Sequence, residues 1–195
     1  MKNKRTLLVI VALVVLFILW GVRIYNGLVT MEENVNAQWA NVETSYQRRA
    51  DLIPNLVATV QGYADFEQET LTQVIEARAK ATSINIDPSN LTPEAISQFE
   101  AAQGELSSAL SRLLVTVERY PELKANQNFL ELQAQLEGTE NRISVERRKF
   151  NEIAKEFNAA IRRIPRNFIA GLGGFEARGY FESAAGTETA PEVAF

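Results

Sequence analysis

An apolar segment near the start of the chain continues without a turn signal into an amphipathic helix, and this continuity constrains the fold more than any other feature. From Thr6 to Val22 no side chain is charged, and about 17 such residues lie at the short end of what spans a bilayer. Past Arg23, apolar residues recur at spacings of three and four as far as Tyr46, which is typical of one buried helix stripe. We therefore predict one helix that leaves a membrane and becomes the first element of a bundle.

Residues 1–23 are interpreted as a retained, single-pass membrane anchor. Lys2, Lys4 and Arg5 precede the apolar run, whereas only Arg23 follows it closely, and this bias predicts a cytoplasmic N-terminus with the bundle on the other side. A cleaved signal peptide is the alternative, but the residues after the run are bulky and offer no Ala-x-Ala-like site. The predicted membrane-contacting side chains are Leu7, Leu8, Val9, Ile10, Leu13, Leu16, Phe17, Leu19 and Trp20.

Composition excludes several classes of chemistry. The chain has no cysteine and no histidine, so disulfides, thiolate nucleophiles, Ser-His-Asp triads and His-ligated zinc or di-iron sites are ruled out. Its 20 basic and 24 acidic residues form no long block of one sign, and no nucleic-acid footprint is indicated. We predict no catalytic residue, no cofactor and no metal ligand.

The remaining pattern predicts an all-α protein in which the transmembrane helix is followed by a long antiparallel up-and-down four-helix bundle over residues 24–165. Asp51 and Pro54 suit the N-cap and first turn of a second helix, although one helix kinked at Pro54 is also possible. Residues 84–92 form a linker rich in turn-forming residues. The expected helices cover about 24–50, 52–83, 93–120 and 126–163.

A Gly-broken apolar hook, residues 166–182, follows the bundle. The up-and-down topology returns this hook to the membrane, where it either covers the membrane-proximal end of the bundle or rests in the interfacial layer. Residues 183–195 are small and polar, and we expect them to be disordered. The candidate interfacial residues of the hook are Phe168, Ile169, Leu172, Phe175, Tyr180 and Phe181.

Ionisable residues on or beside buried stripes mark a candidate polar patch for a partner or ligand, because a buried charge must be paired or functional. The alternative is a set of ion pairs and caps that fix helix register, with Arg48 and Arg49 reaching Glu118 or Glu122. The patch consists of Arg48, Arg49, Asp51, Glu140 and Arg142.

Several segments resemble the signature segments of the LemA family. They are Tyr25-Asn26-Gly27-Leu28-Val29, Trp39-Ala40-Asn41-Val42-Glu43, Gln47-Arg48-Arg49-Ala50-Asp51-Leu52-Ile53-Pro54-Asn55-Leu56-Val57, Gly62-Tyr63-Ala64, Leu136-Glu137-Gly138-Thr139-Glu140-Asn141-Arg142-Ile143 and Tyr180-Phe181. The resemblance extends from the anchor to Phe181. It implies a bacterial single-pass membrane protein with an extended helical bundle, in a family whose biochemical activity is not established.

These observations predict a non-enzymatic helical interaction or scaffold protein of the bacterial envelope. Its expected partner is another envelope protein or a second copy of itself, for which Leu114, Val115 and Leu123 offer an apolar surface. The alternative is a lipid-headgroup or small-molecule binder, with its site between the membrane-proximal helix ends and the hook. An enzyme is the least favoured class.

Overall fold

The computed structural model describes residues 2–63 and 67–182, so the predicted disordered tail lies outside the described residues. Within them every regular element is helical, which confirms the all-α prediction. The elements are α1 (Lys2–Gln61), α2 (Gln68–Ser83), the 3-10 turn η1 (Pro88–Asn90), α3 (Pro93–Val117), α4 (Pro121–Lys124), α5 (Gln127–Arg162) and α6 (Arg166–Gly173).

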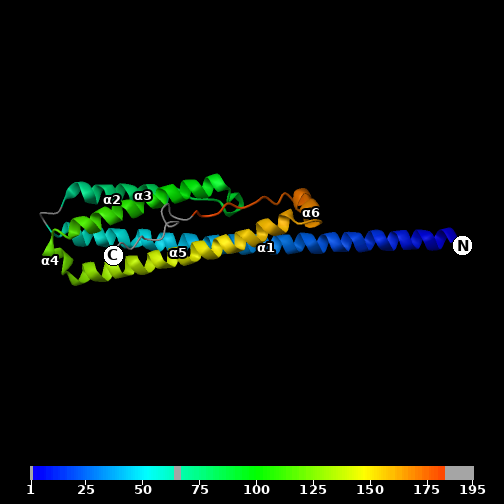
Figure 1. The fold of residues 1–195 in the computed structure, drawn as a ribbon, viewed down its shortest axis with the longest axis horizontal. Coiled ribbons are helices and arrows are strands. Elements are labelled where there is room, and N and C mark those ends of the chain that lie inside the picture. Colours follow the sequence, from blue (N-terminus) through cyan, green and yellow to red (C-terminus); the bar gives the residue numbers. More distant parts are fainter. Residues whose placement is uncertain (1, 64–66, 183–195) are drawn as a thin grey trace, which may run out of the picture.

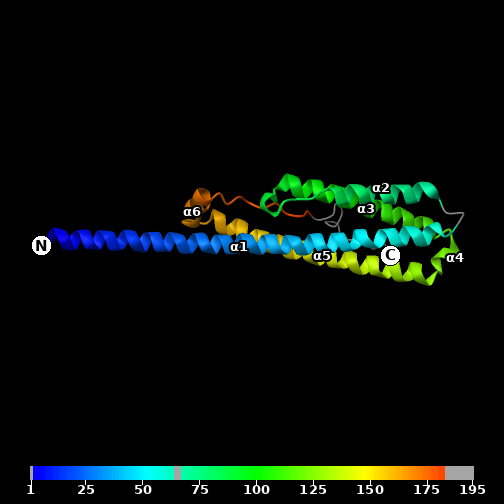
Figure 2. The same cartoon turned by 180° about the vertical axis from the view of Figure 1, so that it is seen from behind.

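The helices form an elongated antiparallel bundle with α1 projecting from one end (Figure 1). Helix α5 lies along α1 over most of the bundle, and the α2–α3 hairpin covers the half nearer the C-terminus of α1, as both views show (Figures 1 and 2). We call the end carrying α4 the distal end and the end carrying α6 the proximal end. The up-and-down topology is as predicted.

Helix α1 runs through Pro54 to Gln61, so the predicted break between residues 50 and 52 is wrong and the alternative of a single helix through Pro54 is correct. Proline has no N–H to donate to the carbonyl four residues earlier, here that of Ala50. The Arg78 Nε of α2 donates to this carbonyl oxygen at 2.8 Å and replaces the missing donor. Asp51 is not an N-cap, and its carboxylate accepts a 2.7 Å hydrogen bond from the Gln47 amide within the same helix.

The later helix boundaries were predicted closely, because side-chain caps mark them. The Thr92 hydroxyl accepts from the Ala95 N–H at 3.2 Å and caps α3, and the Asn126 side chain accepts from the Phe129 N–H at 3.1 Å and caps α5. Pro121 opens the short helix α4 between them.

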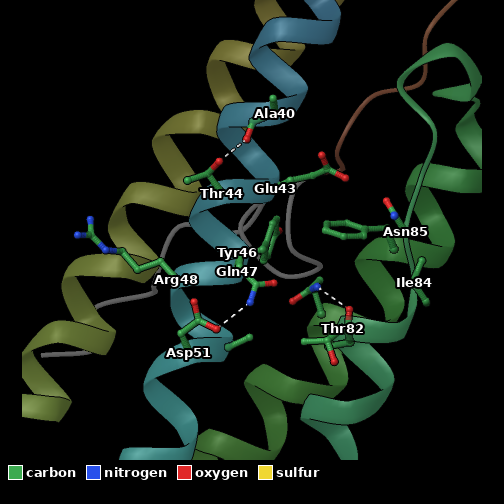
Figure 3. Close-up of a pocket in the computed structure, with 14 residues that line it drawn as sticks. Ala40, Glu43, Thr44, Tyr46, Gln47, Arg48, Asp51, Thr82, Ile84 and Asn85 are labelled. Carbon is green, nitrogen blue, oxygen red and sulfur yellow. Dashed lines mark hydrogen bonds between the residues drawn. The ribbon is translucent and has the colours of Figure 1, made fainter.

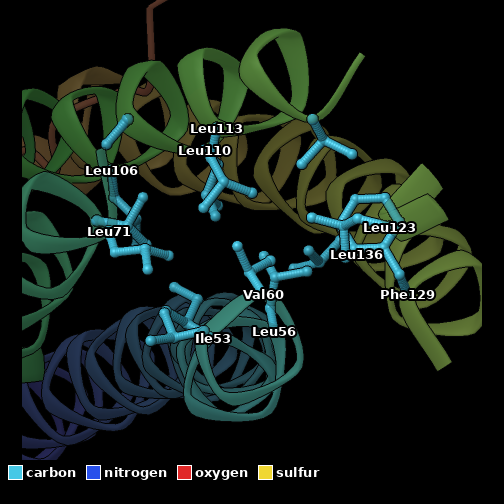
Figure 4. Close-up of a cluster of buried hydrophobic side chains, with 14 of the residues drawn as sticks. Ile53, Leu56, Val60, Leu71, Leu106, Leu110, Leu113, Leu123, Phe129 and Leu136 are labelled. Atoms are coloured by element: carbon cyan, nitrogen blue, oxygen red, sulfur yellow. The ribbon is translucent and has the colours of Figure 1, made fainter. Parts of the chain in front are cut away.

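Two large apolar cores follow one another along the described part of the bundle, and a small third cluster of Leu28, Ala160 and Ala170 lies where α6 packs. The distal core draws aliphatic residues from α1 to α5, with Leu56, Leu113 and Leu123 fully buried (Figure 4). Leu123 is therefore not available to a second copy, Leu114 packs against this core, and only Val115 of the three predicted surface residues is exposed.

The aromatic core lies toward the proximal end. Trp39, which is fully buried, meets Phe99 and Phe150 edge to face at centroid distances of 5.3 and 5.6 Å. Such geometry is the favoured one for aromatic pairs. Phe181, from beyond α6, stacks on Trp39 at 5.8 Å, so the C-terminal segment is part of the core.

Candidate membrane-proximal site and polar patch

The apolar segment of α1 extends beyond the bundle, and its side chains from Leu7 to Leu19 are all about half exposed or more. This is the one described helix that is long and apolar enough to cross a membrane. The predicted anchor residues therefore share a surface that no other part of the described chain covers. Trp20 closes the segment at 42% exposure.

Helix α6 packs against α1 where the apolar segment ends. The Ile169 Cδ1 lies 3.8 Å from the point where a Cβ on Gly21 would sit, and the rings of Tyr25 and Phe175 are 5.5 Å apart. The C-terminal residue of α6, Gly173, is so close to Phe175 and Tyr25 that a Cβ there would meet their rings at 2.7 and 3.0 Å. Glycine at this position permits α6 to pack closely against α1.

The six predicted hook residues divide into two groups. Phe168 and Leu172, four residues apart on α6, are 67% and 88% exposed, and Ile164, just before the helix, is also exposed. We call these three residues the α6 stripe. Ile169 faces α1 and is half-buried. The other three belong to residues 174–182, which we call the strap. Phe175 is half-buried, Tyr180 is 44% exposed and Phe181 is buried.

Two asparagines one heptad apart on α5 hold the main chain of the strap. The Asn158 side chain accepts from the Arg178 N–H and donates to the Arg178 carbonyl, both at 2.8 Å. Asn151 makes the same pair with Phe181, at 2.9 and 2.8 Å. On the other side the Gly179 N–H donates to the Leu91 carbonyl at 2.8 Å. Sequence reasoning missed both asparagines, although polar residues beside Phe150 and Phe157 on a buried face were a usable signal.

Arg178 is 6% exposed and inserts into the bundle from the strap. Its guanidinium donates to a Glu32 carboxylate oxygen at 2.5 Å and to the Ser89 carbonyl at 2.8 Å, and it lies over the Phe157 ring. The strap thereby ties α1 and η1 to α5. Sequence analysis did not single out Arg178, because no apolar periodicity runs through this segment.

The α6 region also carries a basic groove, lined among others by Trp20, Arg23, Lys155, Arg163 and Arg166. It consists of two adjoining hollows of about 480 and 520 Å³ that share Met31 and Arg166. Two carboxylates, those of Glu152 and Glu156, line its side nearer the bundle.

The predicted polar patch is only partly a cluster. Arg49 is 2% exposed and donates to Glu140 Oε2 and Ser107 Oγ at 2.8 Å and to Gln103 Oε1 at 2.7 Å. Glu140 is half exposed. Arg49 thus pairs across the bundle with Glu140 and not with Glu118 or Glu122, which lie at the distal end, and this part of the patch fixes helix packing.

Arg48, Asp51 and Arg142 remain on the surface. Arg48 lies between a groove of about 650 Å³ on the α2–α3 side of α1 and one of about 760 Å³ on the α5 side, and it lines both (Figure 3 shows the first). Asp51 lines the first groove and Arg142 the second. Burial raises the pKa of the Glu43 carboxyl and of the Tyr46 hydroxyl, which both line the first groove.

The residues of these sites offer polar and ionic contacts to a partner or an anion. No group of three or more carboxylates gathers for a metal ion among residues 2–63 and 67–182. Polar grooves around Arg48 suit a peptide or protein surface, and the basic groove suits an anion.

Comparison with known proteins agrees with this architecture. Residues 38–195 match the LemA family. The magnetosome protein MamQ of Magnetospirillum gryphiswaldense is 28% identical over 184 residues, covering 85% of this chain and 67% of that protein. Magnetosome protein MamQ 2 of Paramagnetospirillum magneticum is 27% identical over 195 residues, covering 90% and 71%.

Protein LemA of Metamycoplasma hominis is 26% identical over 145 residues, which cover 74% of this chain and 63% of that protein, less than two thirds of its length. These relatives and the long apolar helix indicate a membrane-associated helical protein. Because the family match extends over far more than half of its length, the chain belongs to the LemA family.

Proposed function

We propose that this protein is a non-enzymatic scaffold of a bacterial membrane, which holds a partner protein at the Arg48 grooves. The observation that carries the proposal is the continuity of α1. A single helix joins the exposed apolar segment to Arg48, and the 26 residues from Val22 to Arg48 correspond to about 40 Å at the rise of an α-helix. A docking surface there would stand well clear of the bilayer and at a fixed distance from it.

The neighbouring contacts support rigidity at this height. Arg49, one residue after Arg48, is locked to α3 and α5 through Gln103 and Glu140. Arg48 itself makes no hydrogen bond or ion pair to any described residue, while polar side chains such as Thr44 surround it on both sides. An exposed arginine on a rigid support, between two polar grooves, is suited to recognise a partner's carboxylates.

A photo-crosslinking amino acid in place of Thr44, an exposed residue that lines both grooves, tests this proposal in the full chain expressed in its own host and leaves Arg48 intact. The matched control is the same replacement of Ser111, an exposed residue of α3 that lines neither groove. We expect one discrete adduct from position 44 and none from position 111. An adduct containing only a second copy would assign the grooves to self-association, and equal adducts from both positions would contradict a partner at Arg48.

We also propose that the N-terminus is cytoplasmic and the bundle extracytoplasmic, on the charge bias that flanks the apolar segment. Because the chain has no cysteine, Glu137→Cys on the exposed face of α5 provides a unique label site. A membrane-impermeant maleimide added to intact cells should label it. Labelling only after the cells are opened would show that the bundle is cytoplasmic.

A second candidate function, the binding of lipid at the proximal end, is favoured by the α6 stripe. Its exposed residues lie beside the end of the apolar segment, and aromatic and aliphatic side chains at that height are typical of the interfacial layer. In membranes that contain the full-length protein, Leu172→Cys should react slowly with a water-soluble maleimide. Gly171→Cys, on the neighbouring exposed position, should react quickly. Equal reaction rates at the two positions would show that α6 does not contact the bilayer.

A further inference from the structure

Four cationic side chains of the basic groove lack a counter-charge. Arg23, Lys155, Arg163 and Arg166 make no ion pair with any residue in the described part of the chain. Elsewhere in the bundle, Arg49, Arg147 and Arg178 are each paired with a carboxylate. The two hollows of the groove hold these four cations against two carboxylates, so the groove has a net positive charge.

The position of the groove defines what can neutralise it. The hollow lined by Arg23 and Arg166 also contains Trp20, the last aromatic residue of the apolar segment. Helix α6, whose first residue is Arg166, turns its exposed stripe outward at the same height. A chain anchored by residues 7–20 therefore holds the groove at the level of the lipid headgroups, where tryptophan and arginine are enriched and phosphates are the prevailing anions.

We infer that the basic groove between α1, α5 and α6 binds the phosphate headgroup of an anionic phospholipid, with Arg23 and Arg166 as its principal ligands. Arginine is well suited to this task, because its planar guanidinium donates two parallel hydrogen bonds to one phosphate. Glu152 and Glu156, on the bundle side, would repel a headgroup and so confine it to the membrane side of the groove. The inference rests on the proposed placement of α6 at the bilayer and adds to it a preference for charge.

Trp20 provides a direct readout. The chain has two tryptophans, and Trp39 is fully buried in the aromatic core, so lipid quenching reports on Trp20. The full-length protein is reconstituted in phosphatidylcholine vesicles that contain a minor fraction of either brominated phosphatidylglycerol or brominated phosphatidylcholine. We expect brominated phosphatidylglycerol to quench Trp20 at several-fold lower content.

Arginine variants test the ligands. Arg23→Gln and Arg166→Gln should each reduce this preference roughly fivefold or to none, the size expected for a basic side chain near an anionic surface. Arg162→Gln is the matched control, because Arg162 lies at the same end of α5 but does not line the groove. It should keep the preference. Loss of the preference in Arg162→Gln to the same extent would show a diffuse surface charge and overturn the site.

Two further outcomes separate the possible failures. Equal quenching by both brominated lipids would overturn the inference while leaving α6 at the bilayer. No quenching by either lipid would overturn both the inference and the membrane placement on which it rests. Replacing chloride by inorganic phosphate at equal ionic strength distinguishes a lipid headgroup from free phosphate as the bound anion. If the groove binds free phosphate, the preference for phosphatidylglycerol will be lost in that buffer, and the lipid assignment is then overturned.

Discussion

The distal and proximal halves of the bundle each contain an apolar core, but the two cores are closed by different kinds of contact. In the distal half, α1, α2, α3 and α5 contribute aliphatic side chains, and helix-on-helix packing completes the core. In the proximal half, no described residue of α2 joins the aromatic core, and the strap takes its place. Beyond Phe175 the strap is not helical, and Asn151 and Asn158 satisfy the main-chain groups of Phe181 and Arg178 instead.

The stability of the proximal half therefore depends on a few side-chain hydrogen bonds, each of which pairs with a main-chain group of the strap. An unpaired buried N–H or carbonyl costs far more than a lost surface hydrogen bond. The strap also begins directly after α6, so whatever holds the strap also positions α6 against α1. The proximal half thereby connects the bundle core to α6 and to the end of the apolar segment of α1.

The largest effect is expected from Phe181→Ala. Phe181 is 4% exposed and packs on Trp39 and Phe150, and removal of such a ring costs about 3–5 kcal/mol. We expect hydrogen exchange in detergent micelles to rise sharply in the strap and little in α2. Tyr180→Phe, which loses only a hydroxyl that accepts from Asn158, is the control. A uniform rise through both halves would show that they unfold as one unit and break the comparison.

Gly179→Ala should detach the same segment by steric conflict. An added Cβ would lie 2.7 Å from the Pro93 Cα and 2.8 Å from the Pro93 nitrogen, both main-chain atoms that cannot rotate away. We expect a loss of up to about 3 kcal/mol in the free energy of unfolding, measured by chemical denaturation. Gly138→Ala in α5, where a Cβ meets nothing within 4 Å, should instead stabilise by about 0.5–1 kcal/mol. Equal effects at both glycines would contradict a tight strap.

Arg78→Met tests the polar contact of the distal half. It leaves the Ala50 carbonyl without a donor, at an expected cost of about 2 kcal/mol. Pro54→Ala restores the helical N–H for that carbonyl, so Arg78→Met should cost much less in the Pro54→Ala background. The double-mutant cycle is read by chemical denaturation. Additive effects would show that Arg78 stabilises the distal half in some other way.

The sequence allowed most of the fold to be predicted, because apolar spacing and caps are local signals. The spacing in α3 and α5 was regular, and the turn-forming linker over residues 84–92 marked the start of α3. The path through Pro54 depends on a contact between the Ala50 carbonyl and Arg78, 28 positions later, which no local pattern contains. Asp51 and Pro54 are as compatible with the start of a second helix as with one continuous helix. The hydrogen bond from Arg78 to the Ala50 carbonyl favours the continuous helix.

The candidate sites were less predictable for the same reason. Arg49 and Glu140 were both singled out, but their pairing depends on the register between α1 and α5. Phe181 and Phe168 looked alike as apolar residues of one hook, yet one is buried and the other exposed. What separates them is the pair of asparagines on α5, whose role appears only when the strap lies against them.

The smallest effect is expected from Gln38→Met, and it carries a pH signature. Gln38 of α1 donates to Glu146 Oε2 of α5 at 2.9 Å, and both residues are buried. This hydrogen bond lowers the pKa of Glu146, helped by Lys149 and Arg142 and opposed by burial. A carboxyl whose pKa is lower in the folded state contributes stability above its unfolded pKa and loses it as the pH falls through the folded value.

Gln38→Met should therefore cost about 1 kcal/mol near neutral pH, and its difference from the wild type should shrink as the pH falls through the lowered pKa of Glu146. Burial raises the pKa of Glu100 in the same half, which gives the opposite pH trend, but Glu100 is present in both proteins and cancels in the difference. Gln47→Met, which removes an exposed hydrogen bond to Asp51, should show little change at any pH. A difference that persists in acid would assign Gln38 to packing alone, and the polar contacts of the proximal half would then be those of the strap.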